Sequence, residues 1–177
     1  MERQSGQSPE EAFQELPAWC DRGTKRNSKG FTETWIGYKL HADVNDCGLP
    51  VSVAMTSASV HDSQVAIPLM KMTSARIDYL YDLMDAAYDA GEIYNVTRTL
   101  GHVPVIDKNS RGKETIPMAP HEAARSDERT AAKRFNSRIT EEFGASNSMV
   151  RGAQKVMMHL MFGVIAVFAD RLLKLAT

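Results

Sequence analysis

Apolar positions along this chain change their spacing from one segment to the next. Between residues 31 and 56, aromatic and β-branched residues alternate with polar ones, which predicts strands over 35–44 and 51–56 joined by a hairpin turn at 45–50. A short strand over 15–20 is expected before them, running into a polar turn that begins at Asp21. The first third of the chain is therefore predicted to be antiparallel β structure.

The middle of the chain has the pattern of a parallel βαβ unit. A short helix over 64–72 is expected first, with Asp62 or Ser63 as its N-terminal cap. Apolar runs at 77–84 and 103–106 have the length of buried strands, and a helical segment, 90–100, separates them. Glycine and proline predict a loop over 108–120.

Two helices are expected to close the fold. The first covers 122–143 and has Gly144 as its C-terminal cap. The second covers 150–175 and is apolar nearly all round, so it is predicted to be buried. Its longest apolar stretch is shorter than the roughly 18 to 20 residues that span a bilayer, so no membrane partner is expected. Residues 1–14 are expected to form a flexible end or a short helix, and 15–177 a single α/β domain.

Charge and cysteine content narrow the classes of function. The 21 basic and 22 acidic residues leave no global basic excess, so any surface for nucleic acid must be local. Cys20 and Cys47 lie far apart without a CxxC or Cys/His pattern, which favours free thiols in a reducing cytoplasm. The polar N-terminus has no apolar region typical of a secretory signal.

Asp21 and Asp85 are the candidate metal ligands, because both are predicted to follow strands. Carboxylates at neighbouring strand ends can converge on a hard cation such as Mg²⁺. Phosphoryl transfer with two metal ions needs carboxylates from separate segments, and a third acid is normally required. The alternative is that each aspartate caps a turn or a helix.

Several segments together resemble the bacterial insertion-sequence transposases of the DDE type, in the group named after insertion sequence four. They are 35–41, 56–64, Asp85-Ala86-Ala87-Tyr88-Asp89, and Val150-Arg151-Gly152 with Lys155. The resemblance covers most of the chain from about Asp21 onward. It implies an RNase H-like mixed sheet flanked by helices, with two Asp and one Glu that hold Mg²⁺ or Mn²⁺ for DNA nicking and strand transfer. Only twenty residues precede Asp21, so we expect the fold to be N-terminally truncated.

The resemblance assigns the first aspartate to Asp21, the second to Asp85 and the glutamate position to Lys133. The family's glutamate lies in a helical pattern of Tyr, two residues, Arg, three residues, Glu, six residues, Lys. Arg129 matches the arginine, whereas Ser126, Lys133 and Thr140 stand at the other three positions. On one continuous helix, with about 100° per residue, the neighbouring acids Glu122, Glu128 and Glu141 do not fall where they could replace the missing glutamate.

This substitution implies a transposase domain with weak or absent strand-transfer activity. A lysine repels the cation that a glutamate attracts. A non-catalytic relic that binds DNA or oligomerises through its last helix is the alternative function. An unrelated structural protein is a third.

Basic residues cluster in two places that could contact DNA phosphates. One cluster follows Asp21 and the other lies along the helix expected at 122–143, and in both the alternative is a solvated surface. The candidate DNA contacts are Arg22, Lys25, Arg26, Lys29, Arg129, Arg134 and Arg138.

Two further motifs have competing interpretations. His61-Asp62 either adds a ligand for metal or phosphate or caps a helix. Trp35 and Tyr38 either stack on bases or pack the hairpin.

Overall fold

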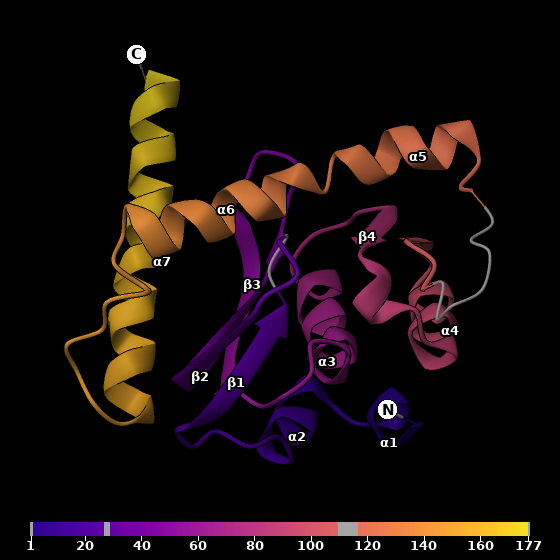
Figure 1. Cartoon of the computed structure of the whole chain (residues 1–177). Helices are drawn as coiled ribbons and strands as arrows, with labels where there is room; N and C mark the ends of the chain where they lie inside the picture. The colour runs from indigo at the N-terminus through magenta and orange to yellow at the C-terminus, as the bar shows by residue number, and fades with distance from the viewer. Residues whose placement is uncertain (1, 27–28, 110–116, 177) are drawn as a thin grey trace. The chain divides into compact units, whose positions relative to one another are not determined.

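The computed structural model describes residues 2–26, 29–109 and 117–176, and it has a mixed α/β architecture (Figure 1). The chain divides into two compact units. The first unit contains Met1–Glu15 and His61–Thr130, and the second contains Leu16–Val60 and Ala131–Thr177. The strands form a three-stranded antiparallel sheet in the second unit and a two-stranded parallel sheet in the first.

The first unit is built on the predicted βαβ succession. β4 (Tyr81–Met84) pairs in parallel with β5 (Val103–Ile106), and α4 (Gly91–Thr99) connects them after the short 3-10 helix η1 (Ala86–Tyr88). α3 (Ser63–Ser74) and α4 pack together over this sheet, while α5 (Pro120–Asp127) packs against both strands. The core of the unit consists of Ala66, Ile67, Met70, Ile93, Val96 and Ile106.

Two short helices, α1 (Glu2–Gly6) and α2 (Pro9–Gln14), pack on α3 in the same unit. Ser8 and Glu11 form a capping box, in which each side chain accepts a hydrogen bond from the other residue's backbone N–H. The Lys71 ammonium donates to the carbonyls of Gln4, Ser5 and Gln7 at 3.0, 2.9 and 2.7 Å. One lysine of α3 thereby satisfies the open carbonyls where α1 ends.

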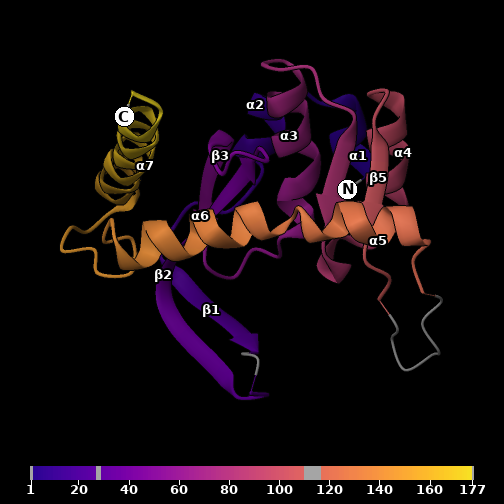
Figure 2. The same cartoon turned by 90° about the horizontal axis from the view of Figure 1, so that it is seen from above.

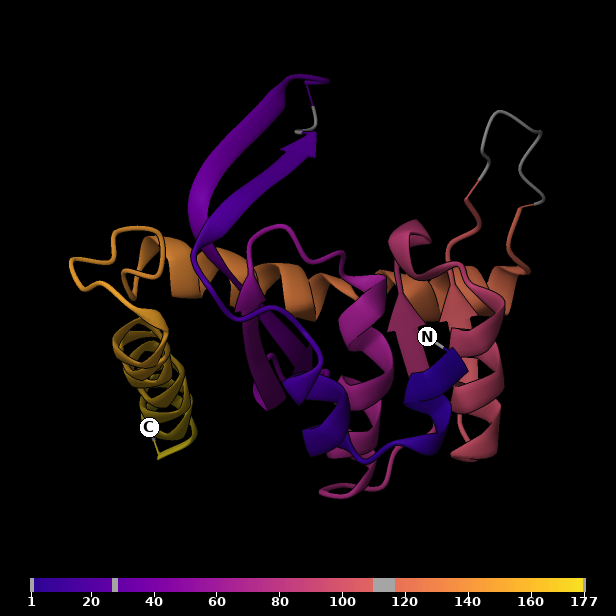
Figure 3. The ribbon, with the colours of Figure 1, turned by 90° about the horizontal axis from the view of Figure 1, so that it is seen from below.

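In the second unit, β2 (Thr32–Val44) is the long central strand of the order β1-β2-β3. Its first half pairs with β1 (Asp21–Arg26) and its second half with β3 (Pro50–Ser57). Figures 2 and 3 show the β1–β2 ribbon extending away from β3. The turn at 45–50 forms as predicted: Gly48 N–H donates to the Asn45 carbonyl at 2.9 Å, with Gly48 at φ +78°.

Two helices, α6 (Thr130–Glu141) and α7 (Ala153–Ala176), complete the second unit. Phe135 and Ile139 of α6 pack with Val164 and Val167 of α7 in a core that is lined by apolar residues of β2 and β3. Gly163 of α7 faces α6, since a Cβ built there would be in ordinary van der Waals contact with Ile139, at 3.4 Å. Gly144 ends the α6 segment at φ +73°, and Ala145 N–H donates to the Ile139 carbonyl, which confirms the predicted C-terminal cap.

Two sequence predictions need correction, and a third falls mostly on residues that the structure does not describe. Residues from Asp21 form strand β1, so the polar turn predicted there is wrong and Asp21 begins a strand instead of following one. The helix predicted over 122–143 is interrupted at Glu128 and Arg129, which lie in a turn between α5 and α6. Most of the predicted loop, 110–116, lies outside the described residues.

The last helix also differs from the prediction. α7 buries one face, whereas Phe162, Ile165 and Leu172 are 60–65% exposed, so the prediction of a buried helix is wrong for its other face. The segment Ala153–Lys174 is long and apolar enough to cross a membrane by length and composition. Contrary to the sequence prediction, the length of this segment therefore does not exclude that it crosses a membrane.

Candidate active site

The carboxyl ends of β4 and β5 place two aspartates side by side. Met84 and Ile106 are partners in the parallel ladder, so Asp85 and Asp107 follow them at the same edge of the sheet. The Asp107 N–H donates to the Met84 carbonyl at 3.2 Å and extends the pairing by one residue. Asp107 was not among the residues selected from the sequence, although its position directly after an apolar run is the same signal that identified Asp85.

Asp85 is exposed and also caps a helix. Its Oδ1 accepts a hydrogen bond from the Ala87 N–H at 2.9 Å, which makes it the N-terminal cap of η1. The capping alternative for this residue is therefore present in the structure. An exposed carboxylate with one oxygen in a single backbone hydrogen bond still has acceptor capacity for a cation or for a water-bound ligand.

Asp107 is held by α5 and by the turn that follows it. Arg129 Nη1 donates to Asp107 Oδ2 and to the Met84 carbonyl, the latter at 3.0 Å. Ser126 Oγ donates to Asp107 Oδ1 at 3.4 Å. Because both carboxylate oxygens already accept hydrogen bonds and a guanidinium neutralises the charge, Asp107 is mainly a structural partner of Arg129.

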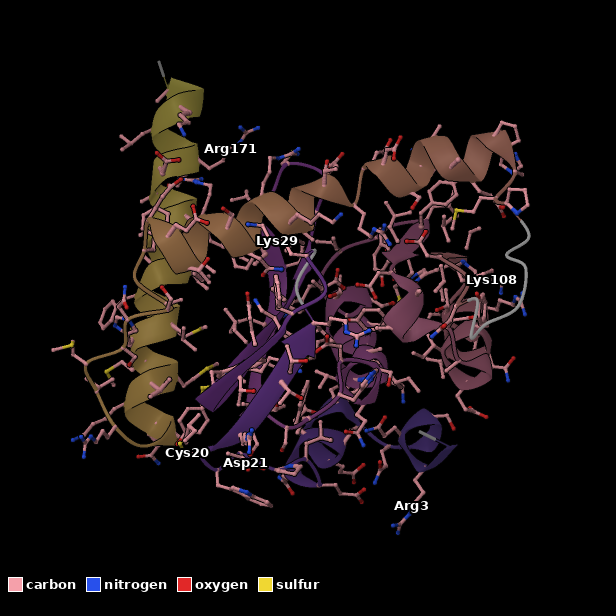
Figure 4. The ribbon with its side chains drawn as sticks, viewed as in Figure 1. Arg3, Cys20, Asp21, Lys29, Lys108 and Arg171 are labelled. Carbon is pink, nitrogen blue, oxygen red and sulfur yellow. The ribbon has the colours of Figure 1, made fainter. Side chains whose placement is uncertain are left out.

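A second polar cluster fixes the segments that follow Asp85 and Asp107. Tyr94 Oη and Lys108 Nζ contact Asp89 Oδ1 at 3.2 and 3.5 Å, and Lys108 also donates to Tyr94 Oη at 2.7 Å. The Asn109 N–H donates to Asp89 Oδ2 at 3.0 Å, and this bond is the main reason that the pKa of Asp89 is lowered. Figure 4 labels Lys108 in the segment after β5. The cluster ties the exits of η1 and β5 together.

In the second unit, Asp21 is the first residue of β1, where Figure 4 labels it beside Cys20. Its Oδ2 accepts a hydrogen bond from Ser59 Oγ at 2.6 Å and its Oδ1 accepts one from the Arg22 N–H at 2.7 Å. These two bonds, that from Ser59 first, lower the pKa of the Asp21 carboxyl. Asp21 is therefore ionised at neutral pH and oriented by its own unit.

The family of the chain follows from a comparison with known proteins. The family model described as "Transposase DDE domain" matches residues 10–167, which is most of the chain. The chain belongs to this family. No curated protein and no solved structure matches it. Members of the DDE transposase family act on DNA and generally use divalent metal ions.

Within this DDE transposase domain, Lys133 lies on α6 and is exposed. Buried Ala131, Phe135 and Ile139 form the opposite, core-facing side of the helix. The turn at Glu128 and Arg129 separates α5 from α6, so the comparison of Glu122 and Glu128 with Lys133 on one continuous helix does not apply. Both acids belong to the first unit, whereas Lys133 belongs to the second.

The donors that the structure describes fall short of a complete metal site. Among residues 2–26, 29–109 and 117–176, no three His, Cys, Asp or Glu side chains are grouped so that they could hold a metal ion. At the β4–β5 edge, Asp85 is the carboxylate with open capacity and Asp107 is neutralised by Arg129. We therefore assign no reaction step to a metal.

Several basic residues of the second cluster, which was expected along 122–143 of this transposase domain, form ion pairs with acidic residues. Arg129 pairs with Asp107, and Arg125 lies 3.5 Å from Glu128. Arg138 pairs with Glu142 and Asp170 at 3.0 and 2.8 Å. Much of the basic charge that the sequence offers for DNA therefore supports the fold instead.

The basic cluster that follows Asp21 lies on the ribbon of β1 and β2 and is arranged differently. Arg22 and Arg26 are exposed, and each lies two positions along β1 from Thr24. The three side chains therefore share one face of the β1–β2 ribbon. Lys25 points to the other face and pairs with Glu33 at 3.2 Å. Lys29 lies beyond the end of β1, where Figure 4 labels it.

The two remaining motifs make local contacts in the structure. His61 Nδ1 contacts Ser63 Oγ at 2.8 Å at the start of α3, while Asp62 makes no side-chain capping bond there. Trp35 packs over Gly23, where a Cβ would lie 2.5 Å from the indole ring, and its Nε1 donates to the Tyr38 carbonyl at 3.4 Å. Packing of the hairpin accounts for Trp35.

Proposed function

We propose that this chain is a DNA transposase domain of the group named after insertion sequence four, with metal-dependent nicking and strand transfer impaired at Lys133. Family membership supports transposition as its function. The observation that carries the proposed impairment is an exposed lysine, with no role in the core, at the position that the resemblance assigns to the third carboxylate. An RNase H-like arrangement of the strands is part of the same proposal.

The charge reversal has a large expected effect on catalysis. A unit-charge pair about 4 Å apart contributes about 4 kcal/mol at an effective dielectric constant of 20, and a lysine changes the sign of that contribution. Each ~1.4 kcal/mol of lost transition-state stabilisation lowers the rate about tenfold. The loss of one ligand interaction therefore lowers the rate by about a thousandfold, before any repulsion by the ammonium is considered.

Asp21 and Asp85 are the two catalytic carboxylates in this proposal, with Mg²⁺ or Mn²⁺ as the weakly held cation. The open carboxylate of Asp85 and the ionised state of Asp21 support these roles. The cytoplasm is the proposed location, where the exposed thiols of Cys20 and Cys47 stay reduced.

DNA is the proposed partner, and the Arg22 and Arg26 face of the β1–β2 ribbon is the best-supported contact. A two-stranded ribbon fits the major groove of DNA, and two arginines on one face can bind phosphates along the backbone. Lys25, Lys29 and Arg134 are secondary candidates. Arg129 and Arg138 contribute less, because their guanidinium groups are engaged with acids.

The test combines metal binding with DNA cleavage. Calorimetry with Mn²⁺ should show weak binding that disappears in Asp85→Ala and strengthens in Lys133→Glu. Asp127→Ala and Lys155→Glu are matched controls, because they make the same changes of charge at other exposed positions. Nicking of a supercoiled plasmid should rise in Lys133→Glu only. A Lys133→Glu protein that folds normally but gains neither metal affinity nor nicking would contradict the proposed impairment.

The alternative function is a non-catalytic relic that binds DNA, and the Arg22 and Arg26 face favours it equally. It predicts DNA affinity that falls with salt, weakens in Arg22→Ala/Arg26→Ala and does not depend on Lys133 or on added metal. Nicking restored in Lys133→Glu would favour the impaired enzyme, and salt-dependent binding without any nicking would favour the relic.

A further inference from the structure

The β1–β2 ribbon has two faces, and one of them is engaged by the fold. Cross-strand partners share a face, so Gly23 lies on the same side as Trp35, and Lys25 on the same side as Glu33. Gly23 is buried under the Trp35 ring, and Lys25 pairs with Glu33 at 3.2 Å. Contacts within the ribbon therefore account for the side chains of this face.

The opposite side is the Arg22 and Arg26 face. It consists of three cross-strand pairs, and all six residues are exposed. The β1 row has an arginine at each end, whereas every side chain of the β2 row carries a methyl group and none is charged. Adjacent strands lie about 4.8 Å apart, so one long side of the face is cationic and the other bears methyl groups. The pairs are Arg22 with Ile36, Thr24 with Thr34, and Arg26 with Thr32.

We propose that the Arg22 and Arg26 face reads base pairs in the major groove of duplex DNA and selects A·T-rich sequence. The inference rests on the proposed function, in which DNA is the partner, and adds base selectivity to it. Thymine presents its C5 methyl in the major groove, where apolar side chains and the methyl of threonine can contact it. Ile36 is 79% exposed and therefore offers most of its side chain for such a contact.

The two rows of the face have different tasks in this proposal. Arg22 and Arg26 are four residues apart, roughly 13 Å along the strand, and bind phosphates, which positions the ribbon without selecting a sequence. Thr32, Thr34 and Ile36 then face the bases. A threonine hydroxyl can bond to more than one base, so the methyl groups carry the selection. The competing mode is a guanine contact by one of the arginines, and it would produce a preference for G·C.

The shape of the ribbon favours duplex DNA over RNA. In the described part of the chain, 21–26 and 32–37 pair only with each other, and Figures 2 and 3 show them extending away from β3. This part is therefore two strands wide, and the major groove of B-form DNA admits a two-stranded ribbon. The major groove of A-form RNA is deep and narrow, so side chains cannot read its bases.

The experiment measures the affinity of the full chain for labelled duplexes of one length by fluorescence anisotropy at fixed salt. One duplex is A·T-rich, and a second has deoxyuridine in place of every thymidine, which removes only the C5 methyls. The affinity should fall about fourfold for each methyl contact that is lost, which corresponds to about 0.8 kcal/mol. Both duplexes present the same minor groove, so the difference reports on the major groove.

Two double variants separate base selection from phosphate binding. Thr34→Ser/Ile36→Ala removes methyl groups and keeps the hydroxyl, so the difference between the thymine and uracil duplexes should shrink to less than twofold. Arg22→Ala/Arg26→Ala should weaken binding to both duplexes by the same factor and reduce the slope of log affinity against log salt by about 2.

Thr99→Ser/Ile77→Ala is the matched control. It makes the same two kinds of substitution at exposed positions of the first unit and should leave both affinities unchanged. Circular dichroism and the melting temperature show whether each variant folds. A native protein with less than a twofold difference between the two DNA duplexes would overturn the proposal, and so would a difference that persists in Thr34→Ser/Ile36→Ala.

Other outcomes identify what the face binds instead. Tighter binding to a G·C-rich duplex would overturn the proposal in favour of guanine contacts, and tighter binding to an RNA duplex would overturn it in favour of RNA. Salt-dependent DNA binding without any effect of the methyl groups would refute base selection alone and leave DNA as the partner. The metal and nicking measurements on Lys133→Glu test the proposed transposase function separately.

An absence of DNA binding would refute both the base selection and the DNA contact assigned to this face.

Discussion

Arg129 offers the most direct test of how this fold supports its candidate site. Its guanidinium joins the turn after α5 to the carboxyl edge of the parallel sheet by bonds to Asp107 and to the Met84 carbonyl. The side chains of Arg129 and Asp107 are 21% and 35% exposed, so their interaction is only partly screened by water. Hydrogen bonds to charged groups contribute about 1.5–3 kcal/mol each, and partial exposure favours the lower end.

We expect Arg129→Met to lower the free energy of unfolding by about 2 kcal/mol. Asp107→Asn should cost about 1 kcal/mol, since the amide retains part of the hydrogen bonding. In the double variant, the second substitution should add little to the cost of the first, so the coupling energy should amount to about 1 kcal/mol. Arg129→Lys should restore the native value only in part, because a flexible ammonium must take the place of Nη1, the single nitrogen that donates both bonds.

Urea denaturation followed by circular dichroism measures all four proteins of the cycle, with the slopes compared to verify a common unfolding transition. Lys25→Met serves as the control, because the Lys25–Glu33 pair has side chains 63% and 48% exposed and should contribute less than about 1 kcal/mol. A coupling energy near zero, or a cost for Arg129→Met no larger than that of the control, would refute the assigned role of Arg129.

Three further predictions concern stability. Gly23→Ala should destabilise the protein by about 1–3 kcal/mol in thermal denaturation, because a Cβ would lie 2.5 Å from the Trp35 ring; an unchanged melting temperature would contradict this. Phe135→Ala should cost about 3–5 kcal/mol, whereas Phe31→Ala, at a position 68% exposed, should cost less than about 0.5 kcal/mol, so equal losses would argue against the core assignment. Burial raises the pKa of the Asp82 carboxyl above its usual value of 3.8. The contribution of this carboxyl to the free energy of unfolding is therefore fully present below pH 3.8 and is lost as the pH rises through the raised pKa. In urea denaturation at a series of pH values, the native protein should lose stability relative to Asp82→Asn over that range, and a difference between the two proteins that stays constant with pH would contradict the prediction.

Local signals predicted the elements that depend mainly on their own residues. β5 begins and ends where the sequence indicated, because Gly101 precedes its apolar run and Asp107 follows it. The turn at Gly48 and the cap at Gly144 were predictable for the same reason, since each needs a residue that adopts positive φ. Asp85 was selected as a candidate ligand because it directly follows an apolar strand, and its role as a ligand stays a prediction.

Tertiary contacts decided what the sequence pattern could not. The polar residues from Asp21 form a strand because β2 supplies a pairing partner for each of them, and not because of their own preference. The break between α5 and α6 coincides with Arg129, whose partners Asp107 and Met84 lie some twenty to forty-five positions away. The exposed face of α7 was missed because an apolar composition does not show which side meets the core.

The exposure of Lys133 on α6 has a consequence for how such a domain can change over time. Its charge can be reversed without repacking Phe135 or any other buried neighbour, so folding exerts no pressure for or against a glutamate there. Arg129 is in the opposite situation, because the sheet edge depends on it whether or not DNA is ever cut. In the proposed signature, these two positions can therefore diverge in opposite ways: a single exposed substitution at Lys133 leaves the architecture in place, and the reverse substitution would meet no structural barrier.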